Sequence, residues 1–120
     1  MHIRSIAAAV VLLGALSAGP ASAQSSDEQE FQAMAAALKA DDTERRSAID
    51  TCIAQGIGDD PAGAAEFMEV PVESAARAWC HRVTNGIAEG RLTLADLQGL
   101  GSGNVSANAE AVLKTPVAGE

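Results

Sequence analysis

Two cysteines, Cys52 and Cys80, constrain this chain of 120 residues more than any other feature. If they pair, the disulfide closes a loop of about 29 residues and stabilises the fold by about 3–4 kcal/mol in the chain-entropy description. A domain of this size buries only a small core, so such a bond supplies a large part of its stability. Pairing requires an oxidising compartment, and the N-terminal sequence indicates whether the chain reaches one.

The first 23 residues have the pattern of a cleaved signal peptide. A short basic start with Arg4 precedes an apolar run from Ile6 to Leu16, and small residues precede the expected cleavage between Ala23 and Gln24. The run is too short for a permanent membrane anchor, which takes roughly 20 apolar residues. We therefore predict a periplasmic or secreted protein with no stable membrane anchor after cleavage. In that compartment the two cysteines are expected to pair with each other.

The composition of the mature chain, residues 24–120, excludes one large class of partner. Removal of Arg4 leaves 7 basic residues against 16 acidic ones, a formal charge of −9, with two phenylalanines, one tryptophan and no tyrosine. Nucleic-acid binding needs clustered Lys and Arg for the phosphates and aromatic rings for the bases. We therefore expect no nucleic-acid partner.

Apolar residues recur at helical spacing in segments that end at proline, glycine or capping residues. Ser26 with Gln29, and Thr93 with Asp96, fit capping boxes, and Asp60 precedes a proline in the position of an N-cap. These signals predict an all-α fold for residues 24–100, a small bundle of four to five short helices joined by one disulfide. The expected helices cover residues 26–40, 62–68, 71–89 and 94–100, with a further helix that follows the capping residues 41–43 and ends at the glycines from Gly56. Residues 101–120 are rich in small and polar residues, and we predict a disordered C-terminal tail there.

The residues that could carry chemistry gather in the stretch Ala78-Trp79-Cys80-His81-Arg82. Cys80 and His81 are neighbours on a predicted helix, so their side chains diverge by about 100° and cannot act as a nucleophile and its base. The chain also lacks the C-x-x-C, C-x-x-C-H and H-x-x-x-H patterns of redox, haem and metal sites. We therefore predict a protein that is not an enzyme, with no catalytic, cofactor-binding or metal-binding residues. A site for a metal or small ligand around Cys80 and His81 is the alternative, because Cys52, Cys80 and His81 are donors that zinc or copper accepts.

Residues 85–96 resemble the calcium-binding loop of EF-hand proteins. Gly90 and Asp96 fall at the sixth and twelfth positions, but Ile87 stands at the third, where calcium needs an oxygen ligand. We predict a turn between two helices, closed by a capping box, at this point.

The remaining polar side chains of the same helix suggest a surface for a partner. Trp79 and Cys80 are expected to face the core, whereas Arg77, His81 and Arg82 are expected to face solvent as an interaction edge on an acidic protein. We call these three residues the basic edge. Arginine and aromatic side chains are frequent anchors of protein interfaces. The leading hypothesis is a protein-binding role, as an envelope accessory or a stress or chaperone-like factor, with another envelope or secreted protein as partner. In architecture alone, without a shared motif, such a protein is similar to the small periplasmic acid chaperones.

Overall fold

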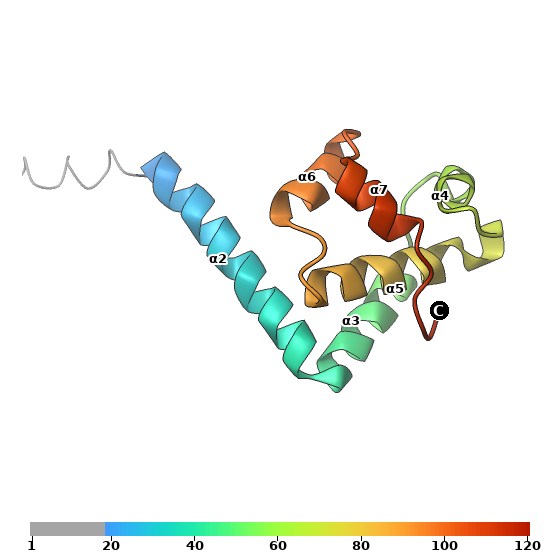
Figure 1. Ribbon diagram of the computed structural model, residues 1–120, viewed down its shortest axis with the longest axis horizontal. Helices are drawn as coiled ribbons and strands as arrows, with labels where there is room; N and C mark the ends of the chain where they lie inside the picture. Colours follow the sequence, from blue (N-terminus) through green and yellow to red (C-terminus); the bar gives the residue numbers. More distant parts are fainter. Residues whose placement is uncertain (1–18) are drawn as a thin grey trace, which may run out of the picture. The chain divides into compact units, whose positions relative to one another are not determined.

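The computed structural model describes the backbone of residues 19–120 and the side chains of residues 26–120. Six α-helices and one 3₁₀-helix, η2, occupy this range and no strand occurs in it (Figure 1). In chain order they are α2 (Gly19–Ala40), α3 (Asp42–Gln55), α4 (Pro61–Met68), η2 (Val72–Ser74), α5 (Ala75–Ala88), α6 (Leu94–Ser102) and α7 (Ala107–Leu113). The all-α prediction is confirmed, and the number of helices exceeds the predicted four to five.

The chain divides into two compact units, Met1–Gln32 and Ala33–Glu120. The predicted signal peptide, residues 1–23, lies for the most part outside the described residues and stays a prediction. The helix α2 begins at Gly19, so the prediction of a helix start at Ser26 is wrong, and Ser26 and Gln29 lie within the helix. None of the helices described from residue 19 onward has the length and apolar character needed to cross a membrane.

Capping side chains fix the helix boundaries of the second unit. Asp41 separates α2 from α3, and its carboxylate accepts hydrogen bonds from the backbone N–H groups of Thr43 and Glu44 at 2.9 and 3.3 Å. Asp60 caps α4 ahead of Pro61. Thr93 begins α6 with a complete capping box, as the sequence predicts. These side chains satisfy N–H groups that the first turn of a helix leaves without backbone partners.

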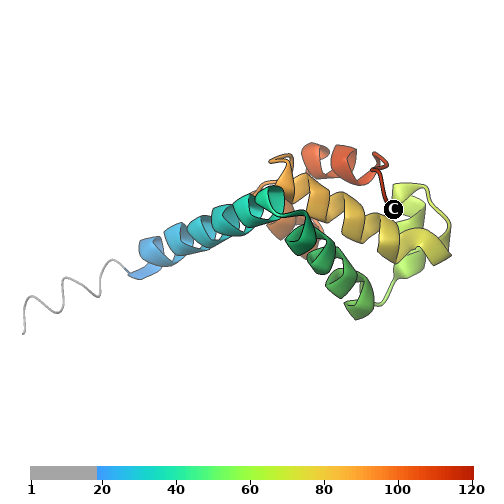
Figure 2. The ribbon, with the colours of Figure 1, turned by 90° about the horizontal axis from the view of Figure 1, so that it is seen from below.

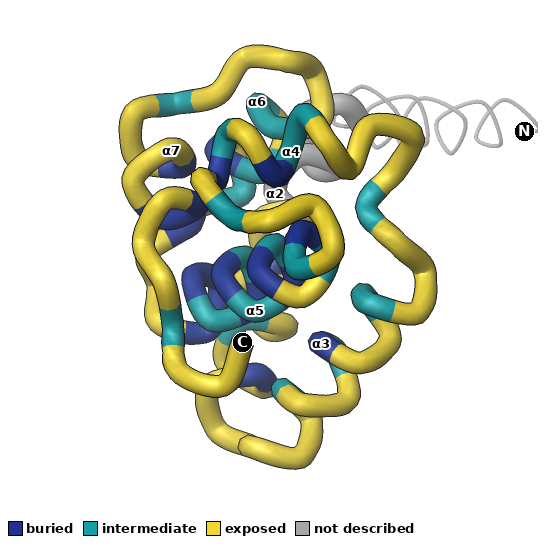
Figure 3. The backbone as a smooth tube through the Cα atoms, turned by 90° about the vertical axis from the view of Figure 1, so that its right-hand side faces the viewer, coloured by how far each residue is buried: buried dark blue, intermediate teal, exposed yellow. Residues whose placement is uncertain are grey.

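Helix α5 is the centre of the second unit, because it contacts α3, α4 and α7 (Figures 1 and 2). Its buried residues lie along the turns that face these neighbours (Figure 3). On the side of α7, Gly86 provides the space: a Cβ atom there would lie 2.9 Å from Leu92 Cδ1 and 3.0 Å from Val112 Cγ1. The absence of a side chain at Gly86 therefore sets how closely these residues can approach α5.

One cluster of the core of this unit combines three alanines with two larger side chains. Its buried members are Ala65, Met68, Ala75, Ala78 and Leu113. Trp79 is half-buried and packs against this cluster, as expected for a core-facing tryptophan. Ala65 of α4 and Ala75 and Ala78 of α5 are small side chains, which favours close packing of these two contacting helices.

The prediction of a disordered tail at residues 101–120 is wrong. Helix α6 continues to Ser102, and α7 follows with Ser106 as its N-cap. Ala109, Val112 and Leu113 are buried. These three residues have the spacing i, i+3 and i+4 of one helix face, and burying them against the rest of the unit stabilises a helix that would be marginal in isolation.

Candidate functional site

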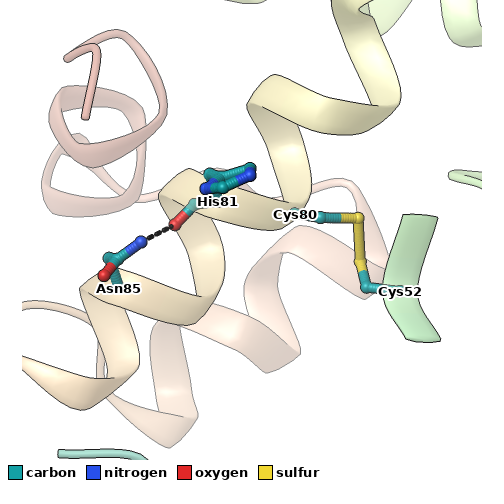
Figure 4. The surroundings of a disulfide bond; sticks show 4 residues. All are labelled: Cys52, Cys80, His81 and Asn85. Carbon is teal, nitrogen blue, oxygen red and sulfur yellow. Dashed lines mark hydrogen bonds between the residues drawn. A yellow bond between two sulfur atoms is a disulfide. The ribbon is translucent and has the colours of Figure 1, made fainter. Parts of the chain in front are cut away.

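The disulfide between Cys52 and Cys80 links α3 to the middle of α5 (Figure 4). The Cα atoms lie 5.8 Å apart, Cys80 is fully buried, and no free cysteine occurs among the described residues. The predicted pairing is confirmed. With the bond intact, neither sulfur is a thiolate, so the metal hypothesis loses two of its three donors.

His81 lies on a different side of α5 from Cys80, as the helical geometry requires (Figure 4). Its imidazole is half-buried, and its backbone carbonyl accepts a hydrogen bond of 2.8 Å from Asn85 Nδ2. Within the part of the chain that the structure describes, no group of three His, Cys, Asp or Glu side chains could hold a metal ion.

Arg82 is buried, so the prediction that it faces solvent is wrong. Only 2% of the residue is exposed. Its Nη1 donates hydrogen bonds to the carbonyl oxygens of Leu113 at 2.7 Å and Met68 at 3.4 Å. These are the last residues of α7 and α4, where carbonyl groups lack partners within the helix and carry the negative end of the helix dipole. One guanidinium group therefore stabilises the ends of two helices.

The other side of the Arg82 guanidinium binds the carboxylate of Glu120. Nε donates to Oε2 at 3.0 Å and Nη2 donates to Oε1 at 2.7 Å, a bidentate pair. The backbone N–H of Val117 donates to the same carboxylate at 3.1 Å. Burial of the Glu120 carboxyl is the largest influence on its pKa and raises it. The hydrogen bonds from Arg82 and Val117, with the charges of Arg82 and His81, outweigh this effect and lower the pKa below its ordinary value.

The C-terminal segment, residues 114–120, therefore lies against the basic edge. Gly119 faces the imidazole of His81, because a Cβ atom at Gly119 would lie 3.5 Å from Cε1 of that ring. Arg77, the third member of the edge, is exposed. Each of the three residues predicted from the sequence is thus close to this segment or to the pocket that Glu120 lines, and of the three only Arg77 is exposed.

An open pocket of about 280 Å³ adjoins the ion pair. Glu120 lines one side of it and Arg77 another, so a cation and an anion face the same space. The remaining lining residues are Val70, Pro71, Ser74 and Ala78. The pocket can therefore accept a small apolar group beside a charged one.

Sequence reasoning identified Asp96 as a capping residue but missed that its charge is buried and bound by side chains at the start of α7. Besides the capping bond from the Thr93 N–H, its oxygens accept hydrogen bonds of 2.7 Å from Ser106 Oγ and from Asn108 Nδ2. The backbone bond from Thr93 and the side-chain bonds from Ser106 and Asn108, partly opposed by burial, lower its pKa to about 2. This cluster joins the start of α6 to the start of α7, and its acceptor sites are occupied within the fold.

The sequence allows only some of the hydrogen-bonding partners of Arg82 and Asp96 to be predicted. The capping box identifies Asp96, and the spacing of Ala109, Val112 and Leu113 indicates α7. Nothing in the local pattern connects Arg82 with Glu120, which lies 38 residues further along the chain. No protein-family model, curated protein or solved structure matches this chain.

Proposed function

We propose that this is a secreted protein that acts by binding another protein through the basic edge and the adjoining pocket. One observation carries the proposal: the edge holds a carboxylate in a bidentate pair with Arg82, beside an exposed arginine and an open pocket. Arginine beside a concave, partly apolar surface is the arrangement that anchors many protein interfaces.

The charge of the chain makes this edge distinctive. The protein carries an excess of acidic residues, whereas Arg77, His81 and Arg82 bring basic groups together over two turns of α5. Electrostatic complementarity of this kind selects partners and orients them more than it adds affinity. The proposed role is therefore recognition of an acidic surface, without a chemical step.

Cross-linking from the edge tests the proposed function. A photoreactive side chain at position 77 is compared with one at position 46, because Arg77 and Arg46 are both exposed arginines on helices of the same unit. The chain is expressed in its own cells and irradiated there. We expect a discrete heterologous cross-linked protein from position 77 and none from position 46. Identical products from both positions, or none from position 77, would show that the edge is ordinary solvated surface.

Secretion is tested separately by sequencing the N-terminus of the protein recovered from the envelope and the medium. We expect the sequence to begin at Gln24, because the small residues before it suit signal peptidase. A protein that retains the N-terminal 23 residues and stays in the cytosol would contradict the proposed localisation.

A further inference from the structure

The C-terminal segment is held on the protein mainly at its two ends. At the first end, Lys114 forms ion pairs with Glu110 at 3.2 Å and Glu69 at 4.0 Å, and its Nζ lies 5.2 Å from the centre of the Phe67 ring. Thr115, Pro116, Ala118 and Gly119 are exposed, and Val117 is half-buried. Near its start, Thr115 Oγ1 donates to the Ala111 carbonyl oxygen of α7 at 2.7 Å. The far end is fixed by the carboxylate of Glu120. Segments with so little buried apolar surface open locally far more often than the core unfolds.

Arg82 limits what can replace the segment. Its side chain is 3% exposed and that of Glu120 is 18% exposed, so departure of Glu120 leaves a buried cation without its counter-ion. An unpaired buried charge is strongly destabilising. Opening is therefore favourable only where another carboxylate takes the place of Glu120.

The neighbouring pocket indicates which groups a replacing segment carries besides its carboxylate. Glu120 both lines the pocket and binds the Arg82 guanidinium, so a group that replaces Glu120 meets Arg82 on one side and the pocket on the other. Val70, Pro71 and Ala78 offer apolar surface there, and Arg77 adds an exposed positive charge. A carboxylate with a small apolar neighbour in an extended chain fits this combination, and the C-terminal segment itself contains one in the sequence Val-Ala-Gly-Glu.

We propose that the C-terminal segment is an internal occupant of a carboxylate-binding site, and that an acidic segment of the partner protein displaces it to bind Arg82 and the pocket. This inference rests on the proposed function and deepens it, because it names the chemistry of the partner and the autoinhibitory contact that the partner removes.

Gly119 allows the segment to be weakened without changing the site. Its φ of 93° lies in the region that residues with a side chain rarely adopt, whereas a Cβ atom would make only an ordinary contact with His81. Gly119→Ala therefore strains the closed segment and leaves Arg82 and Arg77 in place. Gly58→Ala is the matched control, because Gly58 has a φ of 99° and nothing within 4 Å of its added Cβ.

The test measures binding of a fluorescent peptide by anisotropy to the full chain with its disulfide intact. The peptide has the sequence Lys-Thr-Pro-Val-Ala-Gly-Glu with an amidated C-terminus, so the glutamate side chain is its sole carboxylate. We expect Gly119→Ala to bind it roughly five- to thirty-fold more tightly than the unchanged chain, since opening of the segment limits the apparent affinity. Gly58→Ala should bind like the unchanged chain. The same peptide with Gln in place of Glu should bind at least about ten-fold more weakly, because one charged hydrogen-bonding pair is lost.

Three results would overturn the inference. The first is equal affinity of Gly119→Ala and the unchanged chain, and the second is equal affinity of the Glu and Gln peptides. The third is a concentration-dependent dimer of Gly119→Ala that excludes the peptide, because the occupant would then be a second copy of this chain. A partner cross-linked from position 77 together with a failed peptide experiment leaves the proposed function standing and the displacement wrong. Peptide binding without any cross-linked partner shows instead that the proposed function is wrong.

Discussion

Arg82 and Glu120 form a bidentate ion pair across 38 residues of sequence, with nitrogen–oxygen distances of 2.7 and 3.0 Å. The same guanidinium donates to the terminal carbonyls of α4 and α7. A single side chain of α5 therefore joins two helix ends and the C-terminal segment. Arg82 stabilises the fold, and it also binds the carboxylate that we propose a partner replaces. The stability of the protein is therefore linked to the binding that we propose.

Acid titration of Asp96 should lower the stability of the fold over a defined range of pH. Its folded-state pKa of about 2 lies below the ordinary value of 3.8, so the ionised group stabilises the fold above about pH 4. This contribution, about 2 kcal/mol, is lost as the pH falls from about 4 to 2. Urea unfolding of the unchanged chain and of Asp96→Asn at pH 5, 3 and 2 measures the difference.

The Asp96→Asn variant should be about 2 kcal/mol less stable at pH 5 and should approach the unchanged chain at pH 2. The pKa of Glu120 is also lowered, so its titration contributes to the pH dependence of both proteins and cancels in the comparison. Parallel pH profiles for the two proteins would show that the Asp96 carboxylate has no charge-dependent role.

Removal of the disulfide should lower the free energy of unfolding by about 3 kcal/mol. The double variant Cys52→Ala with Cys80→Ala tests this by urea denaturation, with the reduced unchanged chain as a second sample. A thiol titration of the unreduced protein in denaturant should find no free thiol. Two free thiols, or an unchanged unfolding midpoint after reduction, would contradict the structural role of the bond.

The close packing at Gly86 predicts opposite effects for two glycine-to-alanine changes. At Gly86 the added Cβ would overlap Leu92 and Val112, and the cost of overpacking exceeds the gain in helix propensity, for a net loss of about 1 kcal/mol. Gly101 lies in α6 with no atom within 4 Å of an added Cβ, so Gly101→Ala should gain up to about 1 kcal/mol. Thermal unfolding of both variants checks the pair, and a gain of stability at both positions would argue against the tight contact at Gly86.

Features set by neighbours in the sequence were predictable. Asp60 and the pair Thr93 and Asp96 define helix starts by hydrogen bonds within a few residues, and the structure contains them. The cysteine pairing was also predictable, because two cysteines allow one intramolecular bond. Local capping failed at Ser26, where the helix continues toward the N-terminus and the serine lies inside it.

Features set by distant partners were not predictable. A charged residue beside a core-facing tryptophan on an amphipathic helix is expected to face solvent, and Arg82 departs from this because Leu113 and Glu120 supply acceptors from 31 and 38 residues away. Helix α7 has only a short apolar stripe, which becomes decisive when it packs on α5. The basic edge as an interaction surface therefore stays a prediction, with Arg82 buried and with a segment against it that was expected to be disordered.

The central claim is that Arg82 and Glu120 hold the C-terminal segment on α5 as a coupled pair. A double-mutant cycle with Arg82→Met and Glu120→Gln measures this coupling by urea unfolding. We predict that each single variant is destabilised and that the double variant loses less than the sum of the two, with a coupling energy of about 2 kcal/mol. Additive effects, within about 0.5 kcal/mol, would show that the two residues act independently and would contradict the account.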